Sequence, residues 1–488
     1  MYLYLFIMKY LVHAGRSTYR MHVIPDDSTS LYNIYSSNYN IFMQNTEVST
    51  FLDNDYADSA LYISFRSMPN VMDGLKQSGR KVVYVCKKKA LKEPQKVSNL
   101  AGAVIDASQY LHGNTSLEGV IVTLAQDYCG ANNIPLLEGV GSFGTRMFPQ
   151  PSASRYIFAK QQPYFNLLFN PADDLNLDKQ YFEGSEIEPR FYVPTIPLVL
   201  INGGTGIGVG FSSRILGRSV SNMIAVIRNR LAGKRNLDRY FNPSWDGFKG
   251  TVTKLSDSKW EISGVMTRKG KSKIEITELP IPYTWNDYMK TLRSLRDAGV
   301  IKKFSDNSDP STDTFGFEVT LEDAESQKSD AEIMNDLKLV NTVTECFTCI
   351  DRNNAIKEYD SAKEIFEDYF SVKMEYLERR IASETQRLEE ERSTLDEIYR
   401  FISGVAKGTI KVAKLSRKEL ESLLESQGFK AIDKLVSLPI YSLTLDKAQE
   451  AKDRLDAKTE ELEAFRLETP ESQWTKDLDA LEAALKGR

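Results

Sequence analysis

A heptad repeat in the last third of the chain constrains the fold more than any other feature. Apolar residues recur at every seventh position, and charged residues fill most of the positions between them: Met374, Ile381, Leu388, Leu395 and Ile402. A companion series holds Phe370, Leu377 and Ile398, and Glu384 and Glu391 interrupt it. A pattern sustained over this length predicts a long coiled-coil helix.

A second helix is expected to return along the first. Ala448, Leu455 and Leu462 are again spaced at sevens, and the intervening residues 403–444 predict short helices with turns at Gly404, Gly408 and Gly428. Two antiparallel arms capped by a small globule are typical of a dimerisation element or gate. A plain helical bundle is the alternative reading of the same pattern.

The N-terminal third divides into an extension and a series of short helices. Residues 1–45 show no helical period, and Met43 is a plausible alternative start that N-terminal sequencing would test. From Thr46 to about Ala125, short helical patterns predict helices broken at Pro69, Gly74, Gly79 and Pro94. Such a series with a basic segment suits a helix-turn-helix or winged-helix unit.

The middle of the chain predicts strands. Residues 134–210 read as strand and loop, with an apolar run at Ile196–Ile201. From about Gly247 to Asp351 alternating stretches predict a separate α+β module, whose expected strands are Lys254–Gly264, Ser272–Leu279 and Phe315–Leu321.

Composition excludes several classes of protein. The 488 residues suffice for about three domains, and no apolar run approaches the ~20 residues of a membrane span. Four cysteines fit a reducing compartment, so the sequence predicts a cytoplasmic protein without membrane contact. Because only three histidines occur, a multi-histidine metal site is not expected.

Charge is unevenly distributed along a chain whose net charge is −5. Residues 61–100 contain nine basic residues against Asp73 and Glu93. A basic block on an acidic chain indicates one face that binds a polyanion. The alternative is a solvated lysine-rich helix.

Two motifs match those of a dinucleotide site and a zinc site, but the residues around them argue against both. Gly139–Gly144 matches G-x-G-x-x-G, but Pro149 and Pro151 follow where a dinucleotide site needs a helix. Cys346 and Cys349 form one C-x-x-C without a second pair, which favours two buried free thiols over zinc.

Several segments gain meaning when they are considered together. They are Arg66–Lys76 continuing to Gly79–Lys81, Tyr110–Asn114, Gly141–Arg146 with Ser154–Ile157, Asn202–Gly210 and Ser437–Thr444. Their order resembles the DNA breakage-reunion subunit of type IIA topoisomerases over nearly the whole chain from about Met43. Within that family the order is most similar to the T-even bacteriophage branch, in which this half of the enzyme is the medium subunit.

The resemblance assigns the nucleophile to Tyr156. The family's tyrosine attacks a DNA phosphodiester and forms a 5′-phosphotyrosyl link, which conserves the bond energy for resealing. A phenol with a pKa near 10 needs nearby cations or a base to react at neutral pH. Arg155 is adjacent, and Arg66 falls where the family has a phosphate-clamping cation, a role for which a guanidinium is suited.

The same resemblance implies further site residues. His112 is expected to hydrogen-bond near the scissile phosphate, although Leu111 stands where relatives carry a second His or a Pro. Ile207 is expected to wedge between base pairs and bend the cleaved duplex. The remaining expected contacts with DNA are Lys76, Arg80, Lys81 and Arg146.

The family also implies an α+β multidomain fold. The expected parts are an N-terminal extension (1–45), a winged-helix domain with the tyrosine (46–165), a tower domain (166–360), coiled-coil arms (361–402 and 445–488) and a dimerisation globule (403–444). The sequence shows no ATPase or acidic metal-binding (TOPRIM) module. Mg²⁺ and ATP are therefore expected on a separate large subunit, with no metal in this chain.

The expected assembly is a homodimer, through winged-helix and coiled-coil gates, that acts on double-stranded DNA. Because the chain has no room after the return helix for the DNA-wrapping domain of gyrase, relaxation or decatenation is expected. The alternatives are a non-enzymatic winged-helix and coiled-coil protein that bridges DNA segments, and a coiled-coil scaffold that does not bind DNA.

Overall fold

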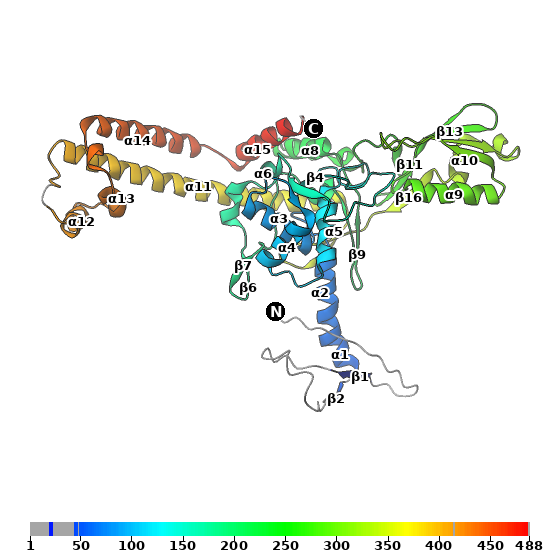
Figure 1. The fold of residues 1–488 in the computed structure, drawn as a ribbon, viewed down its shortest axis with the longest axis horizontal. Helices are drawn as coiled ribbons and strands as arrows, with labels where there is room; N and C mark the ends of the chain where they lie inside the picture. The colour runs from blue at the N-terminus through cyan, green and yellow to red at the C-terminus, as the bar shows by residue number, and fades with distance from the viewer. Residues whose placement is uncertain (1–18, 23–42, 47, 413–414, 487–488) are drawn as a thin grey trace.

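The computed structural model is an elongated molecule (Figure 1). It describes residues 19–22, 43–46, 48–412 and 415–486. A central body (residues 57–246 and 346–380) carries an outer module (residues 247–345) at one end and an arm (residues 381–465) at the other. Within the described residues, none of the helices has the length and apolar content needed to cross a bilayer.

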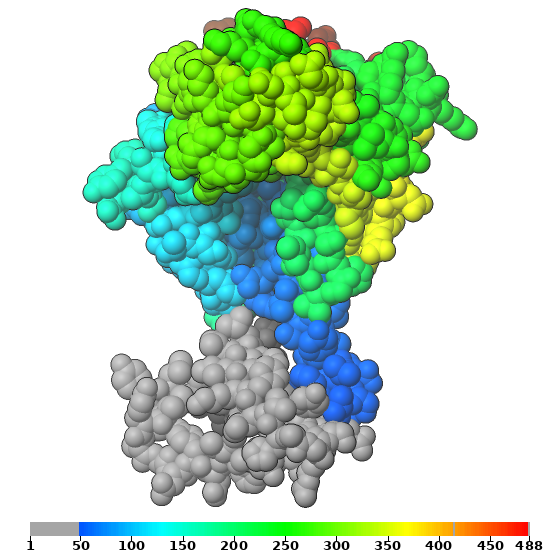
Figure 2. Space-filling model, turned by 90° about the vertical axis from the view of Figure 1, so that its right-hand side faces the viewer, coloured from blue at the N-terminus to red at the C-terminus, as the bar shows by residue number. Residues whose placement is uncertain are grey.

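A helical rod leads into the central body. It runs through α1 (Val48–Phe51), η1 (Leu52–Tyr56) and α2 (Ala57–Ser67), and it projects below the body (Figures 1 and 2). Before it, β1 (Tyr19–His22) pairs antiparallel with β2 (Met43–Thr46). The rest of the predicted extension lies outside the described residues.

Three helices and a small antiparallel sheet organise the first half of the body. They are α3 (Gln77–Lys89), α4 (Val97–Ser108), α5 (Asn114–Ala125) and the strands β3 (Gln95–Lys96), β5 (Phe158–Gln161) and β4 (Leu137–Val140). The predicted breaks at Pro69, Gly74 and Pro94 are confirmed. The break predicted at Gly79 is wrong, because the glycine costs a helix only about 1 kcal/mol and α3 buries Val82, Val83 and Val85.

Residues 134–246 complete the body with short elements. These are α6 (Phe165–Leu168), η2 (Pro171–Asn176), β6 (Gln180–Phe182), β7 (Ser185–Ile187), α7 (Leu198–Ile201), β8 (Gly204–Ile207), β9 (Ser212–Ile215), α8 (Val220–Leu231) and η3 (Asp238–Phe241). The apolar run at Ile196–Ile201 forms the buried turn of α7 and not a strand, since Pro194 and Pro197 limit ladder hydrogen bonds. Phe165 and Phe241 share one hydrophobic core with α3 and α4, so the predicted boundary at 165/166 falls within continuous packing.

The outer module has its own hydrophobic core, as the sequence predicted from about Gly247 onward. One sheet orders β10 (Thr251–Lys254), β11 (Lys259–Ser263) and β16 (Val340–Thr344); the other orders β12 (Val265–Arg268), β13 (Lys273–Glu278), β15 (Phe317–Leu321) and β14 (Ile301–Asp306). Helices α9 (Trp285–Asp297) and α10 (Asp330–Asp336) cover the second sheet. The strands predicted at Ser272–Leu279 and Phe315–Leu321 are confirmed as β13 and β15. The single strand predicted at Lys254–Gly264 is instead a hairpin of β10 and β11.

The arm confirms the long helix that the heptads predicted. Helix α11 (Ala362–Ala406) begins at the N-cap Ser361 and packs along α14 (Leu445–Phe465). It extends past the predicted end at residue 402 because Gly404 packs inside it against Ile410 and makes no turn there. The turns predicted at Gly408 and Gly428 are confirmed by positive φ angles at both residues.

The segment that returns along α11 forms two helices, whereas a single helical arm was predicted over residues 445–488. Thr469 caps a new helix, α15 (Pro470–Leu485), and Pro470 occupies its first turn, where a missing N–H costs nothing. Helix α15 packs on the central body beside α6 and α8, and Trp474 is fully buried there and donates to the Thr195 carbonyl at 2.9 Å. The tip of the arm is a small cluster under α12 (Arg417–Ser426), α13 (Ile432–Val436) and η5 (Ile440–Ser442). A further hairpin, β17 (Phe347–Ile350) and β18 (Ile356–Tyr359), precedes α11.

A buried ionic cluster joins the arm helix to the body. Asp173 of η2 accepts from Arg380 through both oxygens, at 2.6 and 2.7 Å, and from Lys373 at 3.3 Å. Arg380 also donates to Asp477 of α15 at 2.7 Å. Burial by itself raises the pKa of Asp173, but the two cations prevail and hold that pKa below its ordinary value.

We expect the substitution Asp173→Asn to destabilise the protein by about 3–5 kcal/mol, because it leaves Lys373 and Arg380 buried without their main counter-charge. The urea midpoint of unfolding measures this loss. Asp257→Asn is the control, since that carboxylate is 91% exposed and its loss should leave the urea midpoint unchanged. Equal midpoints for the two variants would contradict a stabilising role for the cluster.

Candidate active site

Tyr156 lies on an exposed turn immediately before β5. Its side chain is 66% exposed, and its N–H donates to the Ala153 carbonyl at 2.8 Å. The Arg155 guanidinium carbon lies 4.9 Å from the centre of the Tyr156 ring, so a cation accompanies the phenol. The next residue, Ile157, is buried and its carbonyl accepts from the Val97 N–H at 3.0 Å. The reactive side chain is therefore exposed while the backbone beside it is fixed.

Tyr156 lies near the end of a long loop, residues 141–157, whose two halves are joined by hydrogen bonds. The Ser152 N–H donates to the Ser142 carbonyl at 2.9 Å. Gln126, just after α5, donates from its side-chain amide to the Phe143 and Pro149 carbonyls, at 3.0 and 3.3 Å. Gly144 has a φ of +91°, and a side chain there would collide with the Pro149 backbone, so the loop requires glycine at this point. The last glycine of the G-x-G-x-x-G motif at Gly139–Gly144 therefore shapes this loop.

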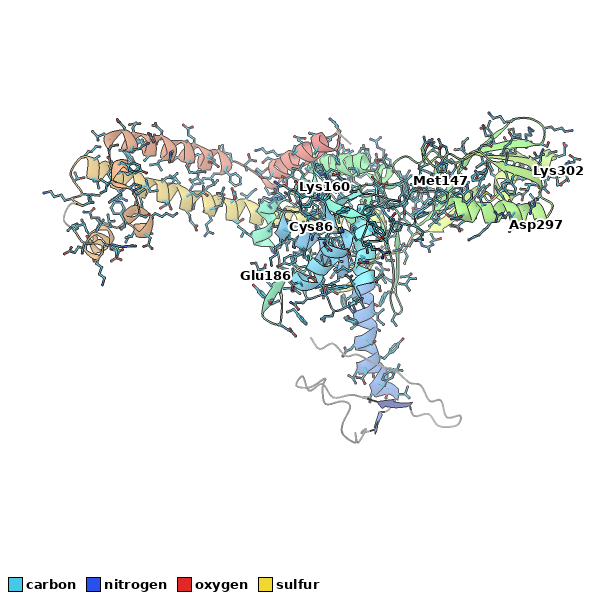
Figure 3. All side chains as sticks on the ribbon, viewed as in Figure 1. Cys86, Met147, Lys160, Glu186, Asp297 and Lys302 are labelled. Atoms are coloured by element: carbon cyan, nitrogen blue, oxygen red, sulfur yellow. The ribbon has the colours of Figure 1, made fainter. Side chains whose placement is uncertain are left out.

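The tip of the loop is inserted into the outer module, where Figure 3 labels Met147. Met147 is fully buried in the core of that module. Arg146 is 7% exposed and donates to the Glu278 carboxylate at 2.6 Å and to the Leu279 carbonyl at 2.5 Å. The guanidinium of Arg146 is therefore occupied by an internal ion pair, and its contact with DNA stays a prediction.

A second group of predicted residues gathers at the end of α2. The His112 Nε2 and the Tyr62 hydroxyl are hydrogen-bonded at 3.1 Å, and Arg66 lies over the Tyr62 ring at 5.5 Å. Tyr110 meets His112 edge-on, with 5.4 Å between ring centres. Tyr62 thus links the two predicted site residues. The sequence analysis missed Tyr62, although its spacing of one helical turn before Arg66 was a usable signal.

His112 is held in its neutral form. Partial burial lowers its pKa below the ordinary 6.5, and the positive charges of Arg66 and Lys81 lower it further. A neutral imidazole keeps one N–H donor and one acceptor nitrogen at physiological pH. The cluster can therefore offer a phosphate both a guanidinium and a neutral donor.

Two further predicted DNA contacts are internal. Arg80 is buried and makes a two-point ion pair with Asp73 at 2.7 and 3.1 Å. Lys81 is buried and donates to the Ser108 carbonyl at 2.6 Å and to Glu188 at 2.9 Å. These two cations neutralise buried carboxylates of the body, and their assignment to phosphate binding stays a prediction. Lys76, at the start of α3, is exposed.

Ile207 ends β8 at the tip of a hairpin and is 82% exposed. The hairpin lies against the last turns of α2, because a side chain at Gly206 would collide with the Ser67 carbonyl and one at Gly208 with the Ser64 hydroxyl. The Val209 N–H also donates to Ser64 at 3.3 Å. The glycine loop thus presents a single large apolar side chain to solvent beside the helix that carries Arg66.

The predicted site residues form two separate groups. Tyr156 and Arg155 contact each other, and no hydrogen bond or ion pair within the described residues joins them to Arg66 or His112. Among the described residues, no group of three or more His, Cys, Asp or Glu side chains is placed to hold a metal ion. Of the predicted buried thiols, Cys349 is buried, whereas Cys346 is half-buried.

Comparisons with known proteins identify the family to which this fold belongs. The family model for the A subunit of DNA gyrase/topoisomerase IV matches residues 66–479. The chain belongs to this family.

Curated relatives and a solved structure support the same family assignment. Putative mitochondrial DNA topoisomerase 2 of Caenorhabditis elegans is 32% identical over 90% of this chain and 40% of its own length. Mitochondrial DNA topoisomerase 2 of Dictyostelium discoideum is 32% identical over 87% and 34%. The crystal structure of the Plasmodium falciparum topoisomerase II DNA-binding, cleavage and re-ligation domain superposes with a TM-score of 0.81, at 30% identity, over 90% of this chain and 65% of that one. The chain thus spans 40% or less of the lengths of these two curated relatives.

We expect Arg66→Gln to raise the pKa of His112, because it removes a positive charge that opposes protonation of the ring. NMR titration of the imidazole signals measures the shift, and His112→Gln assigns the signal among the three histidines. Lys302→Gln is the control, since Lys302 lies at the far end of the outer module (Figure 3). An unchanged His112 pKa in the Arg66 variant would show that the two groups do not interact.

Proposed function

We propose that this chain is the DNA cleavage and religation subunit of an ATP-dependent type IIA topoisomerase. It makes a transient double-strand break so that a second duplex can pass, and the result is relaxation or decatenation. The observation that carries the proposal is Tyr156, an exposed phenol beside the Arg155 cation on a rigid loop. Membership of the gyrase/topoisomerase IV family described above supports it.

In the proposed reaction the Tyr156 oxygen attacks a phosphorus atom of the DNA backbone. The bond from that phosphorus to the 3′ oxygen of the neighbouring nucleotide breaks, and the proton lost by the phenol is balanced by the one that the 3′ oxygen gains. A 5′-phosphotyrosyl ester and a free 3′ hydroxyl result, and reversal reseals the strand. Arg155 favours the phenolate and the charge on the phosphoryl oxygens, because both are anionic.

Arg66 and His112 are proposed to hold the scissile region of DNA. Arg66 supplies a guanidinium that suits phosphate oxygens, and neutral His112 supplies an N–H. Tyr62 orients both side chains through its hydroxyl and its ring. Exposed Lys76 adds a point charge for the backbone, and exposed Ile207 is proposed as the wedge that opens a base step.

The assembly around this subunit is also a proposal. Mg²⁺ and ATP are assigned to a large subunit carrying ATPase and TOPRIM modules, and the homodimer is proposed to close through two gates. One gate is a winged-helix unit of α3–α5 with the sheet β3-β5-β4, and the other is the coiled-coil arm with its tip. The motif order supports a bacteriophage-type division into subunits, whereas the relatives named above are eukaryotic. Residence in the cytoplasm stays a prediction.

Substitution of the nucleophile separates this function from its main alternative, a protein that only bridges DNA segments. We expect Tyr156→Phe to abolish covalent attachment to DNA 5′ ends while DNA binding is retained, because only the hydroxyl is removed. The measurement is SDS-trapped cleavage of supercoiled plasmid with magnesium and a candidate large subunit. Tyr181→Phe is the matched control, since Tyr181 is 64% exposed. No adduct with a large subunit that demonstrably assembles would favour the bridging protein.

The wedge predicts a change in the shape of the DNA. We expect Ile207→Ala to reduce the bent fraction of bound duplex about tenfold, because the apolar group that offsets unstacking is lost. Energy transfer between dyes at the ends of a short duplex measures the bend. Leu467→Ala is the control, since Leu467 is 83% exposed on the link between α14 and α15. Equal bending in the two variants would contradict the wedge.

A further inference from the structure

A carboxylate of the outer module binds the backbone at the tip of the loop that carries Tyr156. Asp313 accepts from the backbone N–H groups of Arg146 and Met147, at 2.8 and 3.0 Å. These groups are neighbours at the tip of the loop, so one side chain fixes both peptide units. Hydrogen bonds from N–H groups to an ionised carboxylate are among the stronger ones in proteins.

Asp313 is itself held in a defined conformation. It lies in the connection between β14 and β15 with a φ of +50°, a region that Asp, Asn and Gly tolerate better than other residues. Asp309 and Thr314 close that connection with reciprocal backbone hydrogen bonds at 2.9 and 3.1 Å. The carboxylate therefore points at the tip from a rigid turn of the outer module.

Other contacts make the tip part of the outer module. Met147 is fully buried in the module's core, and the ring of Phe148 lies 5.5 Å from that of Trp285 on α9. The Arg146 guanidinium, already paired with Glu278, also lies over the ring of Phe315 at 5.0 Å. The tip thus moves with the outer module, whereas the Tyr156 end of the loop is tied to the central body at Ile157.

We propose that Asp313 is a positioning residue for Tyr156, through which the outer module sets where the nucleophile lies. This inference rests on the proposed function. Tyr156 is exposed, and Arg155 is the one side chain in ring contact with it within the described residues, so its placement depends on the backbone of the loop. A misplacement of about 1 Å in a reacting group can reduce a rate about a hundredfold.

Three substitutions separate positioning from general stability. Asp313→Gly removes the carboxylate and tolerates the positive φ, so backbone strain is not introduced. Asp313→Asn keeps the side-chain shape and one acceptor oxygen. It replaces Asp313→Gly in both measurements if the glycine variant unfolds. Asp323→Ala is the control, because Asp323 is a 91% exposed carboxylate on the same module that pairs only with Lys302 in the described chain.

The first measurement uses the full chain alone. Hydrogen exchange, followed by mass spectrometry on peptides covering residues 141–157, should accelerate about tenfold or more in Asp313→Gly. The acceleration should be smaller in Asp313→Asn and absent in Asp323→Ala. Unchanged exchange in the glycine variant, with the melting temperature also unchanged, would overturn the proposal.

The second measurement uses the chain with a large subunit. We expect Asp313→Gly to form the Tyr156 adduct about tenfold more slowly at unchanged DNA affinity, with partial rescue in Asp313→Asn. Faster exchange with a normal rate of adduct formation would overturn the positioning role. Absence of an adduct in the unsubstituted chain would instead refute the proposed function, and the exchange result would still decide whether Asp313 holds the loop.

Discussion

The carboxylate of Asp173 is the point through which the long helix, the central body and the C-terminal helix meet. It is nearly fully buried, and Lys373 and Arg380 of α11 surround it. A single buried charge of this kind would be costly, but cations on a neighbouring helix make burial possible and fix the helix in register and rotation. Arg380 then extends the connection to Asp477, so α15 is fixed by the same group. The direction in which the arm leaves the body follows from this cluster.

Several cations of the basic block serve the interior of the central body. Of the cations in residues 61–100, Arg80 and Lys81 neutralise Asp73 and Glu188 in the interior, and Lys87 pairs with Asp174. Their partners Glu188 and Asp174 lie far along the chain, so no local count of charge could pair them. The same holds for Arg146 and Glu278. Among the predicted site cations outside the interior, Lys76 is exposed, and Arg66 and Arg155 are adjacent to aromatic rings.

An element of this fold could be predicted from the sequence where neighbouring residues determine it, and could not where distant contacts do. The heptads are a local pattern, and they predicted α11 correctly. The Thr469–Pro470 cap is equally local and could have revealed the break between α14 and α15, but the spacing of Leu455 and Leu462 suggested continuity. The apolar run at Ile196–Ile201 could not be assigned from its pattern, because a buried strand and a buried helical turn look alike. At the site, the nucleophile role of Tyr156 came from resemblance and stays a prediction, whereas the contact of the loop tip with Asp313 is entirely tertiary and could not be predicted from local sequence.

The loop before Tyr156 connects the two cores of the molecule, and this has a mechanical consequence. Its tip is packed in the outer module and its end is fixed to β5 and α4, while Gln126 holds its two halves together. A displacement of the outer module relative to the central body must therefore be absorbed within residues 148–156. Pro149 and Pro151 fix two φ angles in this segment, whereas residues 152–156 contain no proline. In the proposed reaction, the position of the nucleophile would therefore depend on the arrangement of the two cores, although within the described residues the ring contact of Tyr156 is with Arg155 and not with the outer module.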